Sequence, residues 1–368
     1  MRKKICCYCD CWGSGGIESF LCTLLLQISL EKLEIDIVTC KMGKSIFTKI
    51  LEEHGVHFFE LSGNQRNFIK NYSLFKNLLK ERQYDVVHLN LFQAMSLYYA
   101  HLAKKTGVMV RIAHSHNTNL RKSYTRTIKL YLHRLFSRLY AKDATDFWAC
   151  SKHAADFMFP MSLIEKNGYT FIPNGINIER FRFNSDIRET VRQQLGIQDR
   201  FVLGHVGRLC YQKNQLFLLE ILKEVCQRNP NSCLLLVGEG EDYNMLKKNT
   251  YALGLENNVI FYGTTTQIEQ LFWAMDVFVL PSRFEGFGIV AVEAQTAGLP
   301  TLCSEEIPKE AFISIYMESQ PLSAGAAQWA DKILLMAEQG RIDCVQLVQD
   351  SGFDMLDVVK KVEQYYHA

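Results

Sequence analysis

Two glutamates, Glu285 and Glu293, stand eight residues apart in the second half of the chain. Glu285 lies in a loop flanked by glycine, and Glu293 lies in the otherwise apolar run 289–294. An acid among apolar residues costs free energy unless it is partnered, so Glu293 is expected to have a purpose. One carboxylate could reach the hydroxyls of a sugar and the other a ribose diol. A helix N-terminal charge for Glu285 and a surface acid for Glu293 are the plainer interpretations.

The loop that carries Glu285 is predicted to join a strand to a helix. The strand ends at Leu280, and the helix begins near Phe287 or Gly288. The first backbone N–H groups of a helix have no partner within the helix, and they attract anions. The segment therefore predicts an anion site flanked by the two carboxylates.

A second set of candidate ligands follows the strand predicted at 201–206. Arg208 offers a planar fork of hydrogen-bond donors, and Lys213 offers a compact positive charge near the start of a helix. Together they could grip a diphosphate. Two solvated charges in a loop would look the same, and the segment alone does not decide between these interpretations.

Glycine-rich turns follow other predicted strands. Gly13, Gly15 and Gly16 come directly after the first strand, where they would let the backbone approach an anion and aim the next helix at a phosphate. They lack the full G-x-G-x-x-G spacing, and a plain tight turn would look the same. Gly238 and Gly263 follow strands of the second half and could line a nucleobase pocket with backbone groups.

Two groups of side chains raise the question of a metal. His114 and His116 lie at the end of a predicted strand, but no further ligand set accompanies them and the chain has no Asp-x-Asp motif. One histidine is therefore interpreted as a hydrogen-bonding side chain rather than a metal ligand. The cysteines within 6–11 lack a second pair at zinc spacing, and they are interpreted as small buried hydrophobic residues.

Strands alternate with helices along the first half of the chain, which is typical of a parallel sheet covered on both faces. Strands are predicted at 5–11, 35–39, 56–61, 85–89, 108–113, 147–150 and 169–172. Helices are predicted near 17–30, 45–54, 68–82, 95–105 and 124–142.

The pattern breaks at 173–175 and then restarts. Strands are predicted at 201–206, 233–237, 259–262, 276–280 and, last, 301–303, with closing helices near 329–338 and 355–366. The predicted fold class is α/β, with two Rossmann-like domains facing one another across a cleft. The N-terminal domain is predicted at 1–173 and the C-terminal domain at 174–353, and a helix at 354–368 is expected to pack back toward the first. Ligands of such sheets bind outside the carboxyl ends of the strands.

The composition fits a folded chain with room for two cores, at 368 residues and 48% hydrophobic. The apolar stretch at 5–11 is too short for a secretory signal, and the one at 20–30 is too short for a bilayer. Twelve cysteines without a disulfide rhythm fit a reducing compartment. We therefore expect a cytoplasmic location.

Charge is unevenly placed along the chain. Residues 1–175 carry 24 Lys and Arg against 14 Asp and Glu, whereas residues 176–368 carry 17 against 25. Residues 111–142 contain eight basic residues and no acid. The basic residues are Arg111, Arg121, Lys122, Arg126, Lys129, Arg134, Arg138 and Lys142. The apolar residues at helical spacing among them are Ile128, Tyr131, Leu132, Leu135, Phe136 and Leu139.

The apolar residues of 111–142 are expected to cover the sheet. The basic ones predict an attraction to anionic lipid headgroups, and thus peripheral docking on the inner face of the membrane. They would also favour an acceptor that carries a lipid diphosphate.

The motifs resemble, in their order along the chain, a family-4 glycosyltransferase of the GT-B fold. They are the glycine loop, Gly207-Arg208-Leu209 with Lys213, Val237-Gly238-Glu239-Gly240 and the pair Glu285 and Glu293. The run 172–177 resembles that family's interdomain junction, and 111–118 is similar to bacterial exopolysaccharide and capsule enzymes. The resemblance covers nearly the whole chain.

This resemblance implies an activity. A hexose or N-acetylhexosamine would move from a nucleotide sugar, with uridine the commoner base, to a saccharide or a polyprenyl-diphosphate-linked acceptor in surface polysaccharide synthesis. The anomeric configuration would be retained, and no metal or other cofactor would be needed. No nucleic-acid partner is expected.

The resemblance also implies a role for each matching residue of the second half. Arg208 and Lys213 would bind and neutralise the leaving diphosphate. Glu285 would contact the donor sugar, and Glu293 the ribose hydroxyls. The backbone N–H groups that complete the phosphate site would be those of Phe287, Gly288 and Ile289.

From the first half, Gly15 and Gly16 would approach the donor, and His116 would sit beside the donor sugar, with His114 the less favoured of the two histidines. One departure from the family pattern lies at 304–310, where many members carry a glycine-rich loop and then an acid. That wall of the sugar pocket is therefore undefined.

Three other functions fit parts of the pattern. A catalytically silent nucleotide-sugar-binding subunit would not need Arg208, Lys213 and both glutamates together. An epimerase on the same fold would act on the nucleotide sugar without an acceptor. A nicotinamide dehydrogenase is disfavoured because the first glycine loop lacks its third glycine, although Asp36 lies at a plausible distance for a ribose contact.

Overall fold

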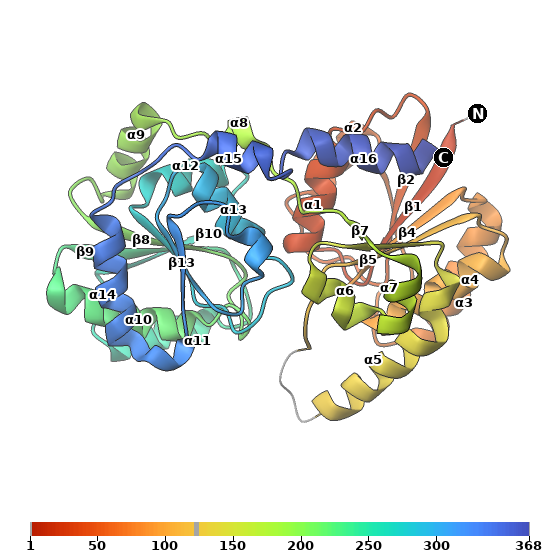
Figure 1. The fold of residues 1–368 in the computed structure, drawn as a ribbon, viewed down its shortest axis with the longest axis horizontal. Coiled ribbons are helices and arrows are strands. Elements are labelled where there is room, and N and C mark those ends of the chain that lie inside the picture. Colours follow the sequence, from red (N-terminus) through yellow and green to blue (C-terminus); the bar gives the residue numbers. More distant parts are fainter. Residues whose placement is uncertain (1, 121–124, 368) are drawn as a thin grey trace. The chain divides into compact units, whose positions relative to one another are not determined.

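The computed structural model describes residues 2–120 and 125–367, which form two α/β units. The first unit comprises residues 1–175 together with 355–368, and the second comprises residues 176–354. Figure 1 shows a central sheet in each unit with helices packed on its faces.

The first unit is built on a seven-stranded parallel sheet of order β3-β2-β1-β4-β5-β6-β7. Its strands are β1 (Lys3–Cys9), β2 (Leu33–Thr39), β3 (His57–Glu60), β4 (Val86–Leu91), β5 (Val110–Ser115), β6 (Asp146–Ala149) and β7 (Thr170–Phe171). The chain builds outward from β1 to β3 and then crosses to the other side of β1 with β4. The strand order therefore reverses between β1 and β4, at the switch point where ligands bind in such sheets.

Helices cover both faces of this sheet. They are α1 (Gly16–Leu25), α2 (Thr48–His54), α3 (Phe68–Arg82), η1 (Ala94–Leu97), α4 (Tyr98–Lys105), α5 (Arg126–Tyr140), η2 (Ala141–Asp143), α6 (Lys152–Met158), α7 (Met161–Asn167) and α16 (Met355–His367). Cys7 and Cys9 of β1 belong to the same buried core as α1 and α16, as small hydrophobic side chains. Tyr8 points to the opposite face, where its ring contacts Phe75 of α3 and Tyr99 of α4. The near-continuous apolar sequence of β1 follows from burial on both faces.

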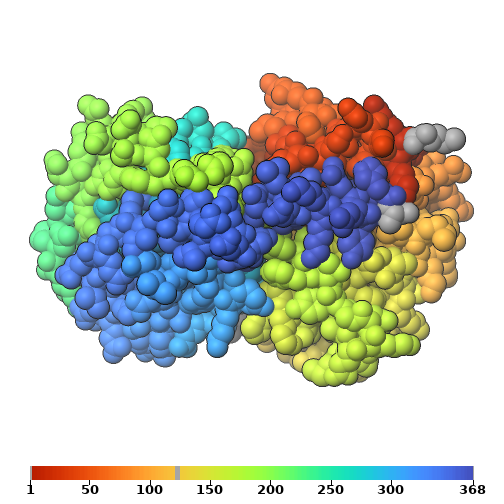
Figure 2. Space-filling view, turned by 45° about the horizontal axis from the view of Figure 1, so that its top comes forward, coloured from red at the N-terminus to blue at the C-terminus, as the bar shows by residue number. Residues whose placement is uncertain are grey.

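The end of the chain returns to the first unit. Helix α16 packs on α1 and β1, and its Tyr366 is fully buried. Figure 2 shows this helix, in dark blue, lying on the red segments that begin the chain. A C-terminal segment thus completes the core that the first strand begins.

Helix α5 differs from its prediction. Its buried residues are polar: His133 bonds the carbonyl of Phe157, and Ser137 bonds that of Met158. The expectation that the apolar residues cover the sheet is wrong for four of them, which are exposed. These are Ile128, Tyr131, Leu135 and Leu139. Helix α5 therefore packs through these two polar residues together with the half-buried Leu132 and Phe136, and it leaves the other four apolar side chains exposed. The predicted basic residues Arg121 and Lys122 lie outside the described residues.

The second unit contains a six-stranded parallel sheet of order β10-β9-β8-β11-β12-β13. Its strands are β8 (Phe201–Val206), β9 (Ser232–Val237), β10 (Val259–Gly263), β11 (Val277–Leu280), β12 (Thr301–Ser304) and β13 (Met317–Gln320). Its helices are α8 (Ile178–Phe181), α9 (Ser185–Leu195), α10 (Gln215–Arg228), α11 (Tyr243–Ala252), α12 (Ile268–Ala274), α13 (Ile289–Thr296), η3 (Lys309–Ala311), η4 (Leu322–Ala324), α14 (Gly325–Ala337) and α15 (Val345–Asp350).

The strand order of the second sheet reverses between β8 and β11. The prediction that 301–303 is the last strand is wrong, because β13 pairs with β12. This edge strand has the sequence Met-Glu-Ser-Gln, which carries neither an alternating nor a β-branched pattern. Its pairing is imposed by the neighbouring strand rather than by its own residues.

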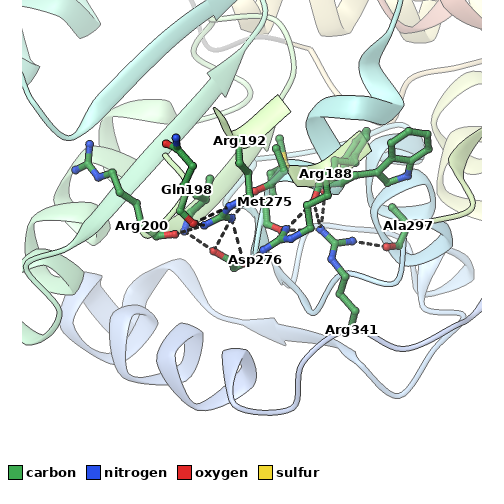
Figure 3. A network of polar contacts seen from close by, with 12 residues as sticks. Arg188, Arg192, Gln198, Arg200, Met275, Asp276, Ala297 and Arg341 are labelled. Carbon is green, nitrogen blue, oxygen red and sulfur yellow. Dashed lines mark hydrogen bonds and ion pairs between the residues drawn. The ribbon is translucent and has the colours of Figure 1, made fainter. Parts of the chain in front are cut away.

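A network of arginines lies at the amino ends of strands β8 and β11, opposite the carboxyl ends where ligands of such sheets bind (Figure 3). Asp276, just before β11, accepts hydrogen bonds from Arg188 at 2.5 Å, from Arg192 at 3.3 Å and from the backbone N–H of Val202 at 2.7 Å. Arg341 donates to the carbonyl groups of Phe272, Trp273, Met275 and Ala297. Burial, reinforced by Arg188, lowers the pKa of Arg341 to about 9. One carboxylate therefore offsets several crowded guanidinium groups.

The Asp276→Ala substitution should destabilise the second unit by about 2–4 kcal/mol, because it leaves Arg188 and Arg192 without their shared carboxylate. Urea unfolding followed by tryptophan fluorescence measures the shift in midpoint. The matched control is Asp331→Ala, which removes the exposed partner of Arg228 and should move the midpoint little. Equal midpoints for the two variants would show that the network does not stabilise this end of the sheet.

Candidate active site

The switch point of the second unit brings together two residues that are 72 positions apart in the sequence. Lys213 follows β8, and Glu285 follows β11. The Lys213 ammonium lies 2.6 Å from Oε1 of Glu285, and the two side chains are only 14% and 7% exposed. The structure thus joins the residue predicted to bind the diphosphate and the residue predicted to bind the sugar in one largely buried ion pair.

Two further side chains hold the Glu285 carboxylate. The hydroxyl of Ser282 donates to Oε1 at 2.6 Å, and the amide of Gln212 donates to Oε2 at 3.3 Å and to the carbonyl of Phe284 at 3.0 Å. Sequence reasoning missed Ser282 and Gln212. The available signal was their position beside Lys213 and Glu285, inside the two motifs.

Additional contacts fasten the loop after β8 to the loop after β11. Asn214 adopts a left-handed conformation with φ of 59°, and its amide donates to the carbonyl of Pro281 at 3.1 Å. Arg283 donates to Oδ1 of Asn214 at 2.6 Å, and its guanidinium lies 4.6 Å from the centre of the Tyr211 ring. The ion pair is therefore preorganised on a rigid frame, a property that electrostatic catalysis requires.

Arg208 lies apart from this frame. Its side chain is 67% exposed and is paired with Glu241 at 3.1 Å. The backbone beside it is tightly packed, since a Cβ added to Gly238 would lie 2.2 Å from the carbonyl oxygen of Gly207. The N–H of Gly238 donates to the carbonyl of Gly263 at 2.8 Å. These two glycines therefore pack the loops at the carboxyl ends of β8, β9 and β10 together.

Helix α13 starts slightly later than predicted, at Ile289, with Gly288 as its N-cap at φ of 83°. The side chain of Phe287 is buried against Phe353. The N-terminus of α13 thus lies in the chain directly after Glu285, as an anion site between the two carboxylates requires.

Glu293 lies in the second turn of α13 and is partly exposed. Among the described residues, no side chain forms a hydrogen bond or ion pair with its carboxylate. Burial raises the pKa of Glu293 from 4.5 to about 7, while Arg180 and Lys213 act in the opposite direction and Glu269 adds to the rise. Arg180 is itself paired with Glu269 at 2.6 Å. Glu293 is therefore a carboxyl group that would ionise near neutral pH.

In the first unit, the predicted glycine loop does form the start of a helix, with Gly15 as the N-cap of α1 and Gly16 as its first residue. The Glu18 carboxylate folds over this loop, because a Cβ added to Gly15 would lie 2.7 Å from Glu18 Oε2. The position that a phosphate would take at this helix start thus faces an acid of the same helix.

The two predicted histidines differ in their surroundings. His116 lies just beyond β5, is 9% exposed, and donates from Nε2 to the side-chain oxygen of Asn90 at 3.0 Å. His114 is fully buried, and its Nδ1 lies 3.1 Å from Nε2 of His88. Burial lowers the pKa of His116 to about 3 and that of His114 well below its ordinary value. Both rings are therefore neutral at physiological pH.

Asp36, which sequence analysis weighed as a ribose ligand, lies in the middle of β2. It is fully buried, and it accepts hydrogen bonds from Arg82 at 2.9 Å and from Tyr84 at 2.6 Å. Asp36 therefore links β2 to Arg82 and Tyr84 within the first unit.

Two parallel α/β units, each with polar loops at the carboxyl ends of its strands, are the architecture of the GT-B glycosyltransferases. The family model described as "Glycosyltransferase Family 4" matches residues 14–180, and the model "Glycosyl transferases group 1" matches residues 187–313. The chain belongs to this glycosyltransferase family, as its motifs predicted, and it is an enzyme of that class.

Named relatives agree with this assignment. The chain is 32% identical to the putative glycosyltransferase EpsF of Bacillus subtilis, over 92% of this chain and 89% of that protein. It is 28% identical to the UDP-Gal:alpha-D-GlcNAc-diphosphoundecaprenol alpha-1,3-galactosyltransferase of Escherichia coli, over 80% of this chain and 78% of that one. The crystal structure of Anabaena HepE in complex with UDP-glucose matches with a TM-score of 0.79 at 21% identity, and covers 98% of both chains. These likenesses confirm the predicted GT-B fold class.

The raised pKa of Glu293 predicts that this acid destabilises the folded chain at alkaline pH. The unfolded chain releases this proton near pH 4.5 and the folded chain only near pH 7. The free energy of unfolding therefore falls as the pH rises from about 4.5 to about 7. Glu293→Gln should therefore be more stable than the wild type at pH 8, on the order of 1–2 kcal/mol, and the difference should shrink toward pH 5. Thermal unfolding at pH 5 and pH 8 measures it.

The matched control is Glu220→Gln, which changes an exposed acid on α10 and should leave the melting temperature unchanged at both pH values. A Glu293→Gln variant that is less stable than the wild type at pH 8 would contradict the raised pKa.

Proposed function

We propose that this glycosyltransferase moves a hexose or N-acetylhexosamine from a UDP-linked donor to a saccharide or polyprenyl-diphosphate-linked acceptor, with retention of configuration and without a metal. The observation that carries the proposal is the buried pair of Lys213 and Glu285 at the switch point of the second unit. The donor and acceptor classes are supported by the relatives, because the name of the Escherichia coli enzyme specifies UDP-Gal and a lipid-diphosphate acceptor.

The pair assigns a task to each side chain. Negative charge develops on the diphosphate as the sugar–phosphate bond breaks, and a preorganised cation stabilises that charge. Lys213 uses one of its three N–H groups on Glu285, so two remain for phosphate oxygens. Glu285 would accept hydrogen bonds from the donor sugar, and Arg208 would turn from Glu241 to the diphosphate.

The remaining candidate residues complete the proposed donor site. Glu293 would hold the ribose hydroxyls, and the backbone N–H groups of Phe287, Gly288 and Ile289 would hold phosphate oxygens. In the first unit, Gly15, Gly16 and His116 would contact the donor as the family resemblance implies. A neutral His116 suits a hydrogen bond to a sugar hydroxyl.

Surface polysaccharide synthesis is the proposed setting. EpsF and the capsular polysaccharide biosynthesis glycosyltransferase CapM of Staphylococcus aureus are among the relatives. A silent nucleotide-sugar-binding subunit and a nucleotide-sugar epimerase are the alternatives. The joint presence of Arg208, Lys213, Glu285 and Glu293 favours the transferase, and hydrolysis of the donor by the purified chain would separate it from a silent subunit.

Lys213→Ala and Arg208→Ala should each lower the turnover of sugar transfer by about a hundredfold or more, because each removes a cation from the leaving diphosphate. Lys213→Gln should act similarly while it preserves a hydrogen bond to Glu285. The measurement is release of UDP from a UDP-sugar in the presence of acceptor. The control is Lys223→Ala, an exposed lysine on α10. Near-normal turnover of either variant would refute the assignment of the diphosphate site.

Activity should survive an excess of EDTA, because Lys213, Arg208 and the N-terminus of α13 would supply the positive charge that a divalent ion supplies elsewhere. The same UDP-release assay measures this, with and without added Mg²⁺ or Mn²⁺. A loss of activity that either ion restores would overturn the metal-independent proposal.

The membrane part of the proposal rests on α5. No helix among the described residues is long and apolar enough to cross a bilayer. The exposed residues Ile128, Tyr131, Leu135 and Leu139 are spaced by three and four positions, so they form one stripe along the helix. Arg134 and Arg138 are exposed beside it. An apolar stripe flanked by arginines is complementary to an anionic lipid surface, in which the apolar side chains enter the interface.

Co-sedimentation with vesicles that contain phosphatidylglycerol should recover the chain at low salt and less of it at high salt, and neutral vesicles should recover little. Leu135→Ser with Leu139→Ser, and separately Arg134→Gln with Arg138→Gln, should each reduce binding several-fold. The control pair is Lys223→Gln with Lys248→Gln, which removes two exposed charges from the second unit. Equal recovery of all variants would leave α5 as ordinary solvated surface.

A further inference from the structure

The switch point of the first unit holds a carboxylate that the proposed donor site does not use. Asp10 is the first residue after β1, and Ser96 lies in η1, which follows β4. Strands β1 and β4 are the neighbours between which the strand order reverses (Figure 1). Ligands of open α/β sheets bind in this crevice, so Asp10 lies at the switch point of the first unit, as Glu285 lies at that of the second, although the two residues follow different strands of the pair.

Two buried hydroxyl groups fix the orientation of Asp10. The Tyr8 hydroxyl donates to Oδ1 at 2.8 Å, and the Ser96 hydroxyl donates to the same oxygen at 2.6 Å. Tyr8 is 0% exposed and Ser96 is 4% exposed. Both donors therefore act on one oxygen, and among the described residues nothing forms a hydrogen bond with Oδ2. Asp10 itself is partly exposed, so its second oxygen is available to a ligand.

The described part of the chain supplies no cation to the Asp10 carboxylate. Within 2–120 and 125–367, no Lys, Arg or His forms an ion pair with Asp10. Burial raises its pKa, and the two hydroxyl groups only partly oppose the rise. Glu285, by contrast, is paired with Lys213 at 2.6 Å. A carboxylate without a cation repels a diphosphate and attracts uncharged groups that donate hydrogen bonds.

The surroundings of Asp10 are aromatic and hydroxylated. Four tyrosine rings form a chain of contacts. The distances between ring centres are 4.3 Å for Tyr8 and Tyr99, 5.1 Å for Tyr99 and Tyr72, and 4.5 Å for Tyr72 and Tyr98. Tyr72 and Tyr98 are partly exposed, whereas Tyr8 and Tyr99 are buried. Tyrosine rings present an apolar face together with a polar tip. Because Tyr8 bonds Asp10 directly, this cluster of tyrosines continues from the carboxylate, and the combination fits a saccharide, which has apolar C–H faces and donor hydroxyls.

We propose that Asp10 binds a hydroxyl of the saccharide acceptor through Oδ2, with Tyr8 and Ser96 as the positioning residues that hold Oδ1. This inference rests on the proposed transferase function and extends it to the acceptor side. The ligand chemistry is that of an uncharged sugar hydroxyl rather than a phosphate, because no cationic side chain among the described residues pairs with Asp10.

The test is the substitution Asp10→Asn. The amide keeps an oxygen for Tyr8 and Ser96, but it puts an N–H donor where Oδ2 accepts. With N-acetylglucosamine on a short lipid diphosphate as acceptor and a UDP-sugar as donor, the acceptor KM should rise about tenfold or more. The dissociation constant for the UDP-sugar, measured by calorimetry without acceptor, should stay within about twofold. The melting temperature should be unchanged.

Two more variants separate acceptor binding by Asp10 from a general effect of substitution. Ser96→Ala removes one of the hydroxyls that hold Oδ1, and it should raise the acceptor KM several-fold while donor binding is unchanged. The control Asp146→Asn alters a partly exposed acid at the amino end of β6, whereas Asp10 follows the carboxyl end of β1. It should change neither constant.

The outcomes separate the two hypotheses. If the wild type transfers no sugar to this acceptor or to free oligosaccharides, the proposed function fails and the inference falls with it. If the wild type transfers sugar and Asp10→Asn leaves the acceptor KM unchanged, or weakens UDP-sugar binding to the same degree, then the inference alone is wrong.

Discussion

The buried ion pair between Lys213 and Glu285 is the interaction on which the organisation of the second unit's site depends. Two opposite charges with little access to water are stable only when their remaining hydrogen-bonding capacity is satisfied. Ser282 and Gln212 provide part of that, and Asn214 with Arg283 keeps the two loops at a fixed separation. The pair thus requires a rigid surrounding, and that rigidity is also what a catalytic electrostatic site needs.

The two units place different side chains at the same topological position, the switch point of the sheet. In the second unit the switch point contains a paired acid and lysine, whereas in the first it contains Asp10 held by hydroxyl groups. Charge counts along the chain would have suggested the reverse, because the first half is the basic one. Its basic residues lie elsewhere, for instance on the exposed surface of α5. The charge at each switch point is thus set by local partners and not by the net charge of the domain.

Much of this organisation could be predicted from the sequence. The alternation of strands and helices reports burial on both faces of a parallel sheet, so it indicates the fold class directly, and 68–82 and 201–206 were predicted at their observed bounds. The glycine-flanked Glu285 and the apolar setting of Glu293 marked candidate site residues by local pattern alone. Their roles in donor binding remain predictions.

Other features depend on contacts that no local pattern encodes. Strand β13 forms because β12 offers it an edge, and α5 buries His133 and Ser137 because these two side chains find carbonyl groups as partners. Asp10 escaped notice because the first strand was predicted to run to residue 11, whereas β1 ends at Cys9, and because a single acid carries no spacing signal. Its significance comes from Ser96, which is 86 residues away, and from the lack of a nearby cation among the described residues.

The central claim is that the pair of Lys213 and Glu285 lies in the donor site. A crystal structure of the chain with a bound UDP-sugar tests it most directly. The account predicts phosphate oxygens within hydrogen-bond distance of Lys213 and of the first N–H groups of α13, with sugar hydroxyls on Glu285. A diphosphate bound elsewhere, with the Lys213–Glu285 pair out of reach of the ligand, would contradict it.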